Sequence, residues 1–302
     1  MNPKKTILLT GGTGLIGSNL TKLLLSDGYE VHHLSRRKTP MLGAKTFYWD
    51  VAKGEIDDEC VNGIDAIIHL AGEGIADKTW TPQRKKAITE SRTESIRLIY
   101  GLLKKKKNKV KSIISASAIG YYSDRGDELL NEDSDPGNDF LANCCTKWEA
   151  AADEGKQLGF QVVKFRTGVV LGNRGALAKM AAPIKWGVGS PLGSGKQWIP
   201  WIHLQDVIDM YRFAIENENI SGVYNMVAPN PVTNKQLTKA IAKQLHRPLW
   251  LPKVPAFVLK LLLGEMSTIV LGSTNVSAQK IKDAGFKFRF PYVAEALKEI
   301  YE

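Results

Sequence analysis

Short apolar runs alternate with longer segments of helical periodicity along the first two thirds of the chain. The runs at residues 65–72, 111–116 and 161–165 have the continuous hydrophobicity of strands buried on both faces. Amphipathic segments at residues 87–103 and 146–158 predict helices between strands. This alternation predicts an α/β fold built on a Rossmann-type doubly wound parallel sheet.

A glycine-spaced turn follows the first apolar run, residues 6–10. Residues 11–17 read GGTGLIG and open a helix with apolar periodicity, and a second strand is expected at residues 30–34. Glycines at this spacing allow a tight turn and close backbone approach to a pyrophosphate, and the helix start favours an anion. An ordinary glycine-rich turn is the alternative. The residues predicted to contact a dinucleotide here are Gly11, Thr13, Gly14, Leu15, Ile16 and Gly17.

Two arginines at the end of the second strand bear on which dinucleotide binds. Arg36 and Arg37 stand about where an acidic residue would bind the ribose 2′-hydroxyl of NAD. Arginine instead suits the 2′-phosphate of NADP, so the sequence favours NADP(H) as the cofactor. A solvated basic pair is the alternative in a lysine-rich chain.

Composition limits the classes of protein that fit. The chain has 302 residues, of which 43% are hydrophobic and 24% charged, enough for a large core in one domain or two closely packed ones. No leader pattern, no apolar stretch of membrane-spanning length and no disulfide or metal-ligand spacing of its three cysteines is visible. We therefore expect a soluble cytoplasmic protein with no membrane partner and no metal.

The net charge of +10 raises the question of a nucleic-acid partner. The densest basic run, residues 104–111, follows a predicted helix end, where cations complement the helix dipole. No aromatic-interleaved basic strand, zinc finger or helix-turn-helix pattern accompanies this run. We expect no nucleic-acid partner, and we expect the basic charge to serve an anionic small molecule.

The composition of the sequence changes after residue 172. Glycine, proline and tryptophan crowd residues 186–201, which predicts loops with aromatic anchors. We expect a cofactor-binding domain at residues 1–172, completed by about 201–228, and a smaller substrate lobe at 173–200 and 229–302. Trp198, Trp201 and His203 are candidate substrate contacts, although a structural histidine is the more ordinary interpretation of His203. The apolar run 257–263 predicts a core helix or a subunit contact, and a homodimer is one possibility.

Several segments together resemble a known family. The segments at 11–17, 69–72, 115–122, 166–172 and 201–206 resemble the extended short-chain dehydrogenase/reductases. Those at 75–81, 191–198 and 262–266 are similar to an atypical group of sugar-nucleotide epimerase-like proteins within it. The resemblance implies an NADP(H)-dependent oxidoreductase or epimerase acting on an anionic or nucleotide-linked substrate. It also implies that Asp50 holds the adenine amino group and that the cofactor is lined by Leu70, Ala71, Gly72, Ser115 and Lys147.

The catalytic pattern of that family is incomplete in this chain. By resemblance, Ser117 is the serine that orients the substrate oxygen, and a Tyr about 25 residues later should precede a Lys by four. Lys147 is present, either as a ligand of the cofactor ribose or as a solvated helix lysine, and a strand-end serine bonded to local backbone is the alternative for Ser117. Position 143, which lies 26 residues after Ser117, is Asn and cannot act as a base near neutral pH. Tyr121, or its neighbour Tyr122, is a candidate replacement, with aromatic packing as the alternative.

Two function classes stay open on the sequence. One is an NADP(H)-dependent oxidoreductase or epimerase in which Ser117, Lys147 and Tyr121 act on the substrate. The other is a non-catalytic NADPH-binding protein that senses or regulates.

Overall fold

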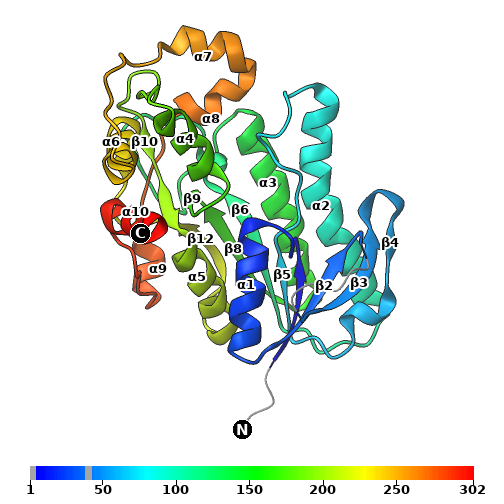
Figure 1. Ribbon diagram of the computed structural model, residues 1–302. Coiled ribbons are helices and arrows are strands. Elements are labelled where there is room, and N and C mark those ends of the chain that lie inside the picture. The colour runs from blue at the N-terminus through cyan, green and yellow to red at the C-terminus, as the bar shows by residue number, and fades with distance from the viewer. Residues whose placement is uncertain (1–4, 38–42) are drawn as a thin grey trace.

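A sheet of eight strands forms the centre of the computed structural model, which describes residues 5–37 and 43–302 (Figure 1). The strand order is β12-β8-β6-β5-β1-β2-β3-β4, and neighbours are parallel except that β4 runs antiparallel to β3. The strands are β1 (Thr6–Thr10), β2 (Glu30–Ser35), β3 (Lys45–Asp50), β4 (Glu55–Ile56), β5 (Ala66–His69), β6 (Ser112–Ala118), β8 (Gln161–Thr167) and β12 (Gly222–Met226). The predicted α/β fold with a mostly parallel Rossmann-type sheet is confirmed.

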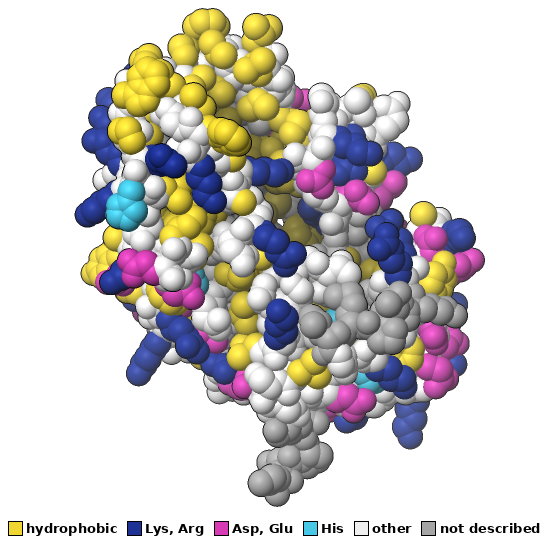
Figure 2. Space-filling view, in the orientation of Figure 1, with side chains coloured by type: hydrophobic (Ala, Val, Ile, Leu, Met, Phe, Trp, Pro, Cys, Tyr) yellow, Lys and Arg dark blue, Asp and Glu magenta, His cyan; other side chains and the backbone are white. Residues whose placement is uncertain are grey.

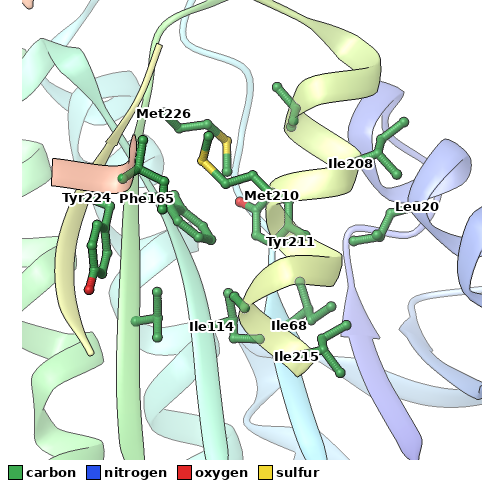
Figure 3. Packing of buried hydrophobic residues seen from close by; sticks show 14 of the residues in the cluster. Leu20, Ile68, Ile114, Phe165, Ile208, Met210, Tyr211, Ile215, Tyr224 and Met226 are labelled. Atoms are coloured by element: carbon green, nitrogen blue, oxygen red, sulfur yellow. The ribbon is translucent and has the colours of Figure 1, made fainter. Parts of the chain in front are cut away.

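Helices cover both faces of this sheet. One face packs against α1 (Leu15–Ser26) and α5 (Leu204–Glu216), and the other against α2 (Pro82–Lys105) and α3 (Phe140–Asp153). Figure 3 shows side chains of α5 packed over the strands, among them Met210, Tyr211 and Ile215 facing Ile68, Ile114 and Phe165. Burial on both faces explains why the strands read as unbroken apolar runs.

The chain reverses its direction of growth across the sheet between β1 and β5. After β1 it adds β2, β3 and β4 on one side, then crosses to β5 and adds β6, β8 and β12 on the other. In open parallel sheets, ligands bind outside the carboxyl ends of the strands at such a switch point. This point brings the glycine turn after β1 beside residues 70–72 after β5.

Helix α3 begins earlier than the amphipathic pattern predicts. It starts at Phe140 rather than near residue 146, because the Asp139 side chain accepts a hydrogen bond from the Ala142 amide (2.9 Å) and caps the helix. Its last predicted turn is a 3-10 helix, Glu154–Leu158. Asn143 and Lys147 are therefore both helical, one turn apart.

A separate hydrophobic cluster lies mainly in the segments where the sequence predicts the smaller lobe, and includes Leu177, Ile184, Leu237 and Leu297. Trp201, from the segment predicted to complete the cofactor-binding domain, also belongs to this cluster. The boundaries of that lobe stay a prediction. Three short strand pairs accompany it: β9 (Val169–Leu171) with β11 (Trp201–His203), β10 (Trp198–Ile199) with β13 (Val232–Thr233), and β7 (Leu129–Leu130) with β14 (Asn275–Val276). The remaining α-helices are α4 (Ala176–Lys185), α6 (Asn234–Gln244), α7 (Ala256–Leu263), α8 (Thr268–Leu271), α9 (Gln279–Asp283) and α10 (Val293–Tyr301). Among the described residues, no helix has the length and apolarity needed to cross a bilayer.

Candidate functional site

Neighbouring backbone atoms leave no room for a side chain at two positions of the glycine turn between β1 and α1, Gly11 and Gly17. Gly11 has a φ of +72°, and a Cβ there would lie 3.0 Å from the Leu70 carbonyl at the end of β5. A Cβ on Gly17 would overlap the carbonyl oxygen of Gly11. These two glycines therefore allow the turn to approach β5 and allow α1 to pack on the turn.

Gly14 differs, because its surroundings are open. It is exposed, and among the described residues, its two chain neighbours apart, only the Gly11 carbonyl oxygen, at 3.3 Å, lies within 4 Å of a Cβ built there. Gly14 is the N-cap residue of α1, and no side chain caps this helix. The first turn of α1 is thus open to an anion at the carboxyl edge of the sheet, as a pyrophosphate requires. Thr13 beside it is exposed, and Leu15 and Ile16 are half-buried.

Two buried polar residues that sequence reasoning missed support this turn. The Thr10 hydroxyl accepts hydrogen bonds from the amides of Leu70 and Ala71, both at 3.0 Å, and so joins the ends of β1 and β5. The His33 ring lies so close to Gly12 that a Cβ on the glycine would come within 2.7 Å of it. The sequence signal for Thr10 and His33 is that each is a polar residue within an otherwise apolar strand.

Two histidines near this edge are held neutral. Burial lowers the pKa of His33 to about 4, with a further contribution from His32, and burial lowers the pKa of His69 to about 3. His33 is hydrogen-bonded to the Thr21 hydroxyl (2.8 Å), and His69 to the Ser95 hydroxyl (2.7 Å). The two histidine side chains beneath the glycine turn and beside residues 70–72 are therefore uncharged at neutral pH.

The residues predicted to select the cofactor lie on neighbouring strands. Arg36 and Arg37 are exposed, directly after β2, and Asp50 ends the adjacent parallel strand β3. The Asp50 carboxylate accepts a hydrogen bond from the Ala52 amide (3.1 Å). All three residues lie at the carboxyl edge that carries the glycine turn, and their contacts with a cofactor stay predictions.

Ser117 takes part in a buried charged cluster. Its hydroxyl donates a hydrogen bond to Glu149 of α3 (2.7 Å), and the same carboxylate accepts from Arg166 of β8 at 2.8 and 3.0 Å. All three side chains are buried. Although burial disfavours the charged form, the Glu149 carboxylate keeps the pKa of Arg166 above its usual value. Sequence reasoning missed Glu149 and Arg166, which only the pairing of β6 with β8 brings beside Ser117.

The two adjacent tyrosines differ in their surroundings. Tyr122 is fully buried; its hydroxyl accepts a hydrogen bond from Arg166 (3.0 Å) and lies 2.7 Å from the amide oxygen of Asn225. Burial raises the pKa of Tyr122 to about 12, against the opposing effect of Arg166. Tyr121 is half-buried, and the Arg166 guanidinium carbon stands 3.4 Å from the centroid of its ring. Tyr121 is thus the more accessible phenol of the two.

Asn143 and Lys147 lie on the exposed side of α3. The Asn143 side-chain amide donates to the Asp139 carbonyl (2.9 Å), so it is engaged with its own helix. Ser115 is fully buried and its hydroxyl donates to the Ala116 carbonyl (3.0 Å). The structure therefore separates Ser117, which faces the inner side of α3, from Lys147 on the outer side.

The candidate substrate contacts have structural partners. The Trp198 indole donates to the Asp127 carboxylate (2.8 Å). Trp201 is fully buried, and its indole donates to the Asn230 carbonyl (2.9 Å). His203 is buried; it caps α5 by accepting from the Gln205 amide (3.1 Å), and burial lowers its pKa. Their roles in binding a substrate stay predictions.

The doubly wound sheet, the switch point and the open glycine turn define a protein of the Rossmann dinucleotide-binding class. Residues 7–226 match the NAD dependent epimerase/dehydratase family, and the chain belongs to that family. Residues 254–300 match a domain of unknown function, DUF1731.

Full-length relatives support this assignment. The chain is 38% identical over 297 residues to the epimerase family protein YfhF of Bacillus subtilis, covering 97% of each chain. It is 37% identical to the chloroplastic epimerase family protein SDR39U1 homolog of Arabidopsis thaliana, covering 98% of this chain and 87% of the relative. A crystal structure of human epimerase family protein SDR39U1 with NADPH aligns with a TM-score of 0.86 at 34% identity, covering 98% and 99% of the two chains.

Proposed function

We propose that this chain binds NADP(H) along the carboxyl edge of β1, β2, β3 and β5. The observation that carries the proposal is the exposed Gly14 at the uncapped start of α1, where no side chain occupies the space next to the helix N-terminus. The crystal structure of the human relative, which contains NADPH, supports the choice of cofactor. When bound, a nicotinamide coenzyme supplies hydride transfer to or from a carbon centre.

In this proposal, residues along the carboxyl edge of the sheet each contact a particular part of the cofactor. The backbone of residues 11–17 would hold the pyrophosphate, and Arg36 and Arg37 the 2′-phosphate. Asp50 would accept from the adenine amino group, and Lys147 would bind the ribose from the exposed side of α3. Residues 70–72 would line the cofactor, held in place by Thr10.

We further propose that the reaction is an oxidation or reduction at a hydroxyl or carbonyl group, without a tyrosine at position 143. The Ser117 hydroxyl donates its hydrogen bond to the Glu149 carboxylate, so only the lone pairs of the Ser117 oxygen are left. That oxygen can accept a hydrogen bond from a substrate hydroxyl. Tyr121 is the half-buried phenol beside the same cluster and would transfer the proton. The substrate would be an anionic or nucleotide-linked small molecule in the smaller lobe, where Trp198, Trp201 and His203 are the candidate contacts.

A second function, regulation through NADPH binding without turnover, is favoured by a specific observation. Asn143 replaces the proton-transferring tyrosine and is bonded to its own helix, and the hydroxyl proton of Ser117 is directed to Glu149. Both features remove proton transfer while leaving the glycine turn open.

One experiment separates the two functions. NADPH-loaded protein is incubated with a panel of sugar nucleotides and small carbonyl compounds, and the loss of NADPH absorbance is followed. Turnover that falls about 10²–10⁴-fold in Tyr121→Phe supports the catalytic proposal. The control Tyr292→Phe, an exposed tyrosine next to α10, should keep full turnover. Unchanged turnover in Tyr121→Phe would exclude Tyr121, and tight NADPH binding without any turnover would favour the regulatory function.

We also propose a reducing compartment such as the cytoplasm. Cys60, Cys144 and Cys145 are all buried and free of disulfides, which fits a reducing environment.

A further inference from the structure

The whole net charge of the protein comes from two segments of the smaller lobe. Residues 173–200 and 229–263 contain ten of the 41 lysines and arginines and none of the 31 acidic residues, so the rest of the chain is electrically balanced. All ten basic side chains are exposed, and none forms an ion pair with any residue in the described ranges 5–37 and 43–302. They are Arg174, Lys179, Lys185, Lys196, Lys235, Lys239, Lys243, Arg247, Lys253 and Lys260.

The same segments carry most of the large exposed apolar side chains. Helix α7 reads AFVLKLLL, yet Leu259 is its one buried residue; Phe257, Leu261 and Leu262 are 71%, 84% and 73% exposed. Trp186, at 84%, and Trp250, at 69%, are also exposed. We call these five exposed residues the α7 face. Figure 2 shows hydrophobic side chains gathered at the top of the molecule, where Figure 1 places α7.

Backbone hydrogen bonds join the parts of the chain that carry the α7 face. The Val254 amide donates to the Pro191 carbonyl (2.9 Å), and the Gly193 amide donates to the Val254 carbonyl (2.8 Å). The loop after Trp186 is thereby attached to the segment that runs from Trp250 into α7. Monomeric proteins rarely expose such a concentration of large apolar side chains unless it binds a partner or a membrane.

We propose that the α7 face docks on the surface of an anionic lipid bilayer. Surface-bound helices combine Leu, Phe and Trp on one side with Lys and Arg around them, and basic residues near the surface are attracted by anionic headgroups. Helix α7, with eight residues, is about 12 Å long, against about 30 Å of bilayer hydrocarbon, so it can only lie in the interface. Tryptophan prefers that depth.

The positive charge of the lobe favours an anionic bilayer over a second copy of the chain as the partner of the α7 face. Self-association through this face would bring two lobes with unpaired positive charge together, whereas an anionic surface neutralises that charge. The proposal departs from the expectation of no membrane partner, which rested on the lack of a spanning segment. It does not depend on the proposed cofactor.

Vesicle co-sedimentation tests the proposal. The full chain is mixed with vesicles of phosphatidylcholine alone or of phosphatidylcholine with phosphatidylglycerol. We expect binding to the anionic vesicles, a blue shift of tryptophan fluorescence on binding, and loss of binding at high salt. Leu261→Gln/Leu262→Gln and Lys253→Ala/Lys260→Ala should each weaken binding at least about tenfold.

Matched variants outside the α7 face control for general effects. Leu129→Gln, at an exposed leucine in β7, and Lys104→Ala/Lys107→Ala, at exposed lysines in the last turn of α2 and just after it, should bind vesicles like the parent. Melting temperature checks that each variant is folded. Absence of binding to anionic vesicles by the parent chain overturns the proposal, as does binding that ignores the Leu261 and Leu262 changes. A dimer in sedimentation velocity that those two changes dissociate, without vesicle binding, would assign the face to a second copy.

Discussion

The two halves of the carboxyl edge of the sheet are built in opposite ways. At the ends of β1, β2 and β5 the backbone is open: Gly14 is exposed, α1 is uncapped, and the buried histidines beneath are neutral. At the ends of β6 and β8 the polar groups are bonded to one another, with Ser117, Glu149 and Arg166 in one buried cluster. The first half is therefore open to solvent at the start of α1. The second has its hydrogen bonds satisfied internally.

This difference shows how binding and chemistry can separate within one fold. The glycine turn requires only backbone and small residues, and it is complete. Proton transfer requires an accessible side chain of suitable pKa, and the position at which the family resemblance predicts a tyrosine holds Asn143. The chain therefore has the features for a nucleotide site independently of the features for one particular reaction.

The largest expected effect comes from breaking the buried cluster. Glu149→Ala should lower the free energy of unfolding by about 3–5 kcal/mol, because it leaves the Arg166 charge buried and unpaired. Urea denaturation measures this change. The control Glu154→Ala removes an exposed ion pair with Arg97 and should cost about 1 kcal/mol or less. Equal losses in the two variants would contradict the contrast between the halves.

The half of the edge that contains the neutral histidines His33 and His69 should instead make the stability of the protein depend on acid. His33 and His69 have folded pKa values of about 4 and about 3, below the unfolded value of about 6.5, so the unfolded chain binds more protons between these limits. Their contribution to stability is fully present above about pH 6.5. It is lost as the pH is lowered below that value, by up to about 1.4 kcal/mol per pH unit for each histidine. Denaturation at pH 6 and pH 5 measures the slope. His33→Gln should flatten it, while His246→Asn, at an exposed position, should not.

Substitutions at two glycines of the turn should have different effects, one on the stability of the protein and the other on NADPH binding. Gly17→Ala should cost about 1–3 kcal/mol, because its Cβ overlaps the Gly11 carbonyl oxygen. Gly14→Val should abolish NADPH binding with a much smaller change in melting temperature, because the space it fills is open. Calorimetric titration and thermal melts check both. Normal NADPH binding by Gly14→Val would mean that the turn does not hold phosphate.

The smallest effect is expected at position 143. Asn143→Ala should change both the free energy of unfolding and the NADPH affinity by less than about 0.5 kcal/mol, since the side chain is exposed and bonded only to its own helix start. A large loss of NADPH affinity would show that Asn143 itself contacts the cofactor.

Features with a local cause were predictable from the sequence. Apolar runs predict the strands that end at Thr10 and Ser35, and the glycine spacing predicts the turn between Gly11 and Gly17. In both cases the cause lies in residues adjacent in the sequence. The start of α3 at Phe140 was missed because it depends on the side chain of Asp139 rather than on periodicity.

Features that depend on distant residues were not predictable. Ser117, Glu149 and Arg166 are ordinary residues in sequence, and only the pairing of β6 with β8 and the packing of α3 bring them together. The exposure of α7 was hidden for a related reason. An apolar octapeptide reads the same whether other elements cover it or solvent does.

Titration of the purified chain with NADPH and with NADH, by calorimetry at low and high salt, tests the central claim most directly. A charge-assisted bond from an arginine to the 2′-phosphate contributes about 1.5–3 kcal/mol, so NADPH should bind about ten- to a hundredfold more tightly than NADH. High salt should narrow the difference, and Arg36→Ala/Arg37→Ala should remove it with little change in NADH affinity. No binding of either dinucleotide, or equal affinity for the two in the unmutated chain, would contradict the account.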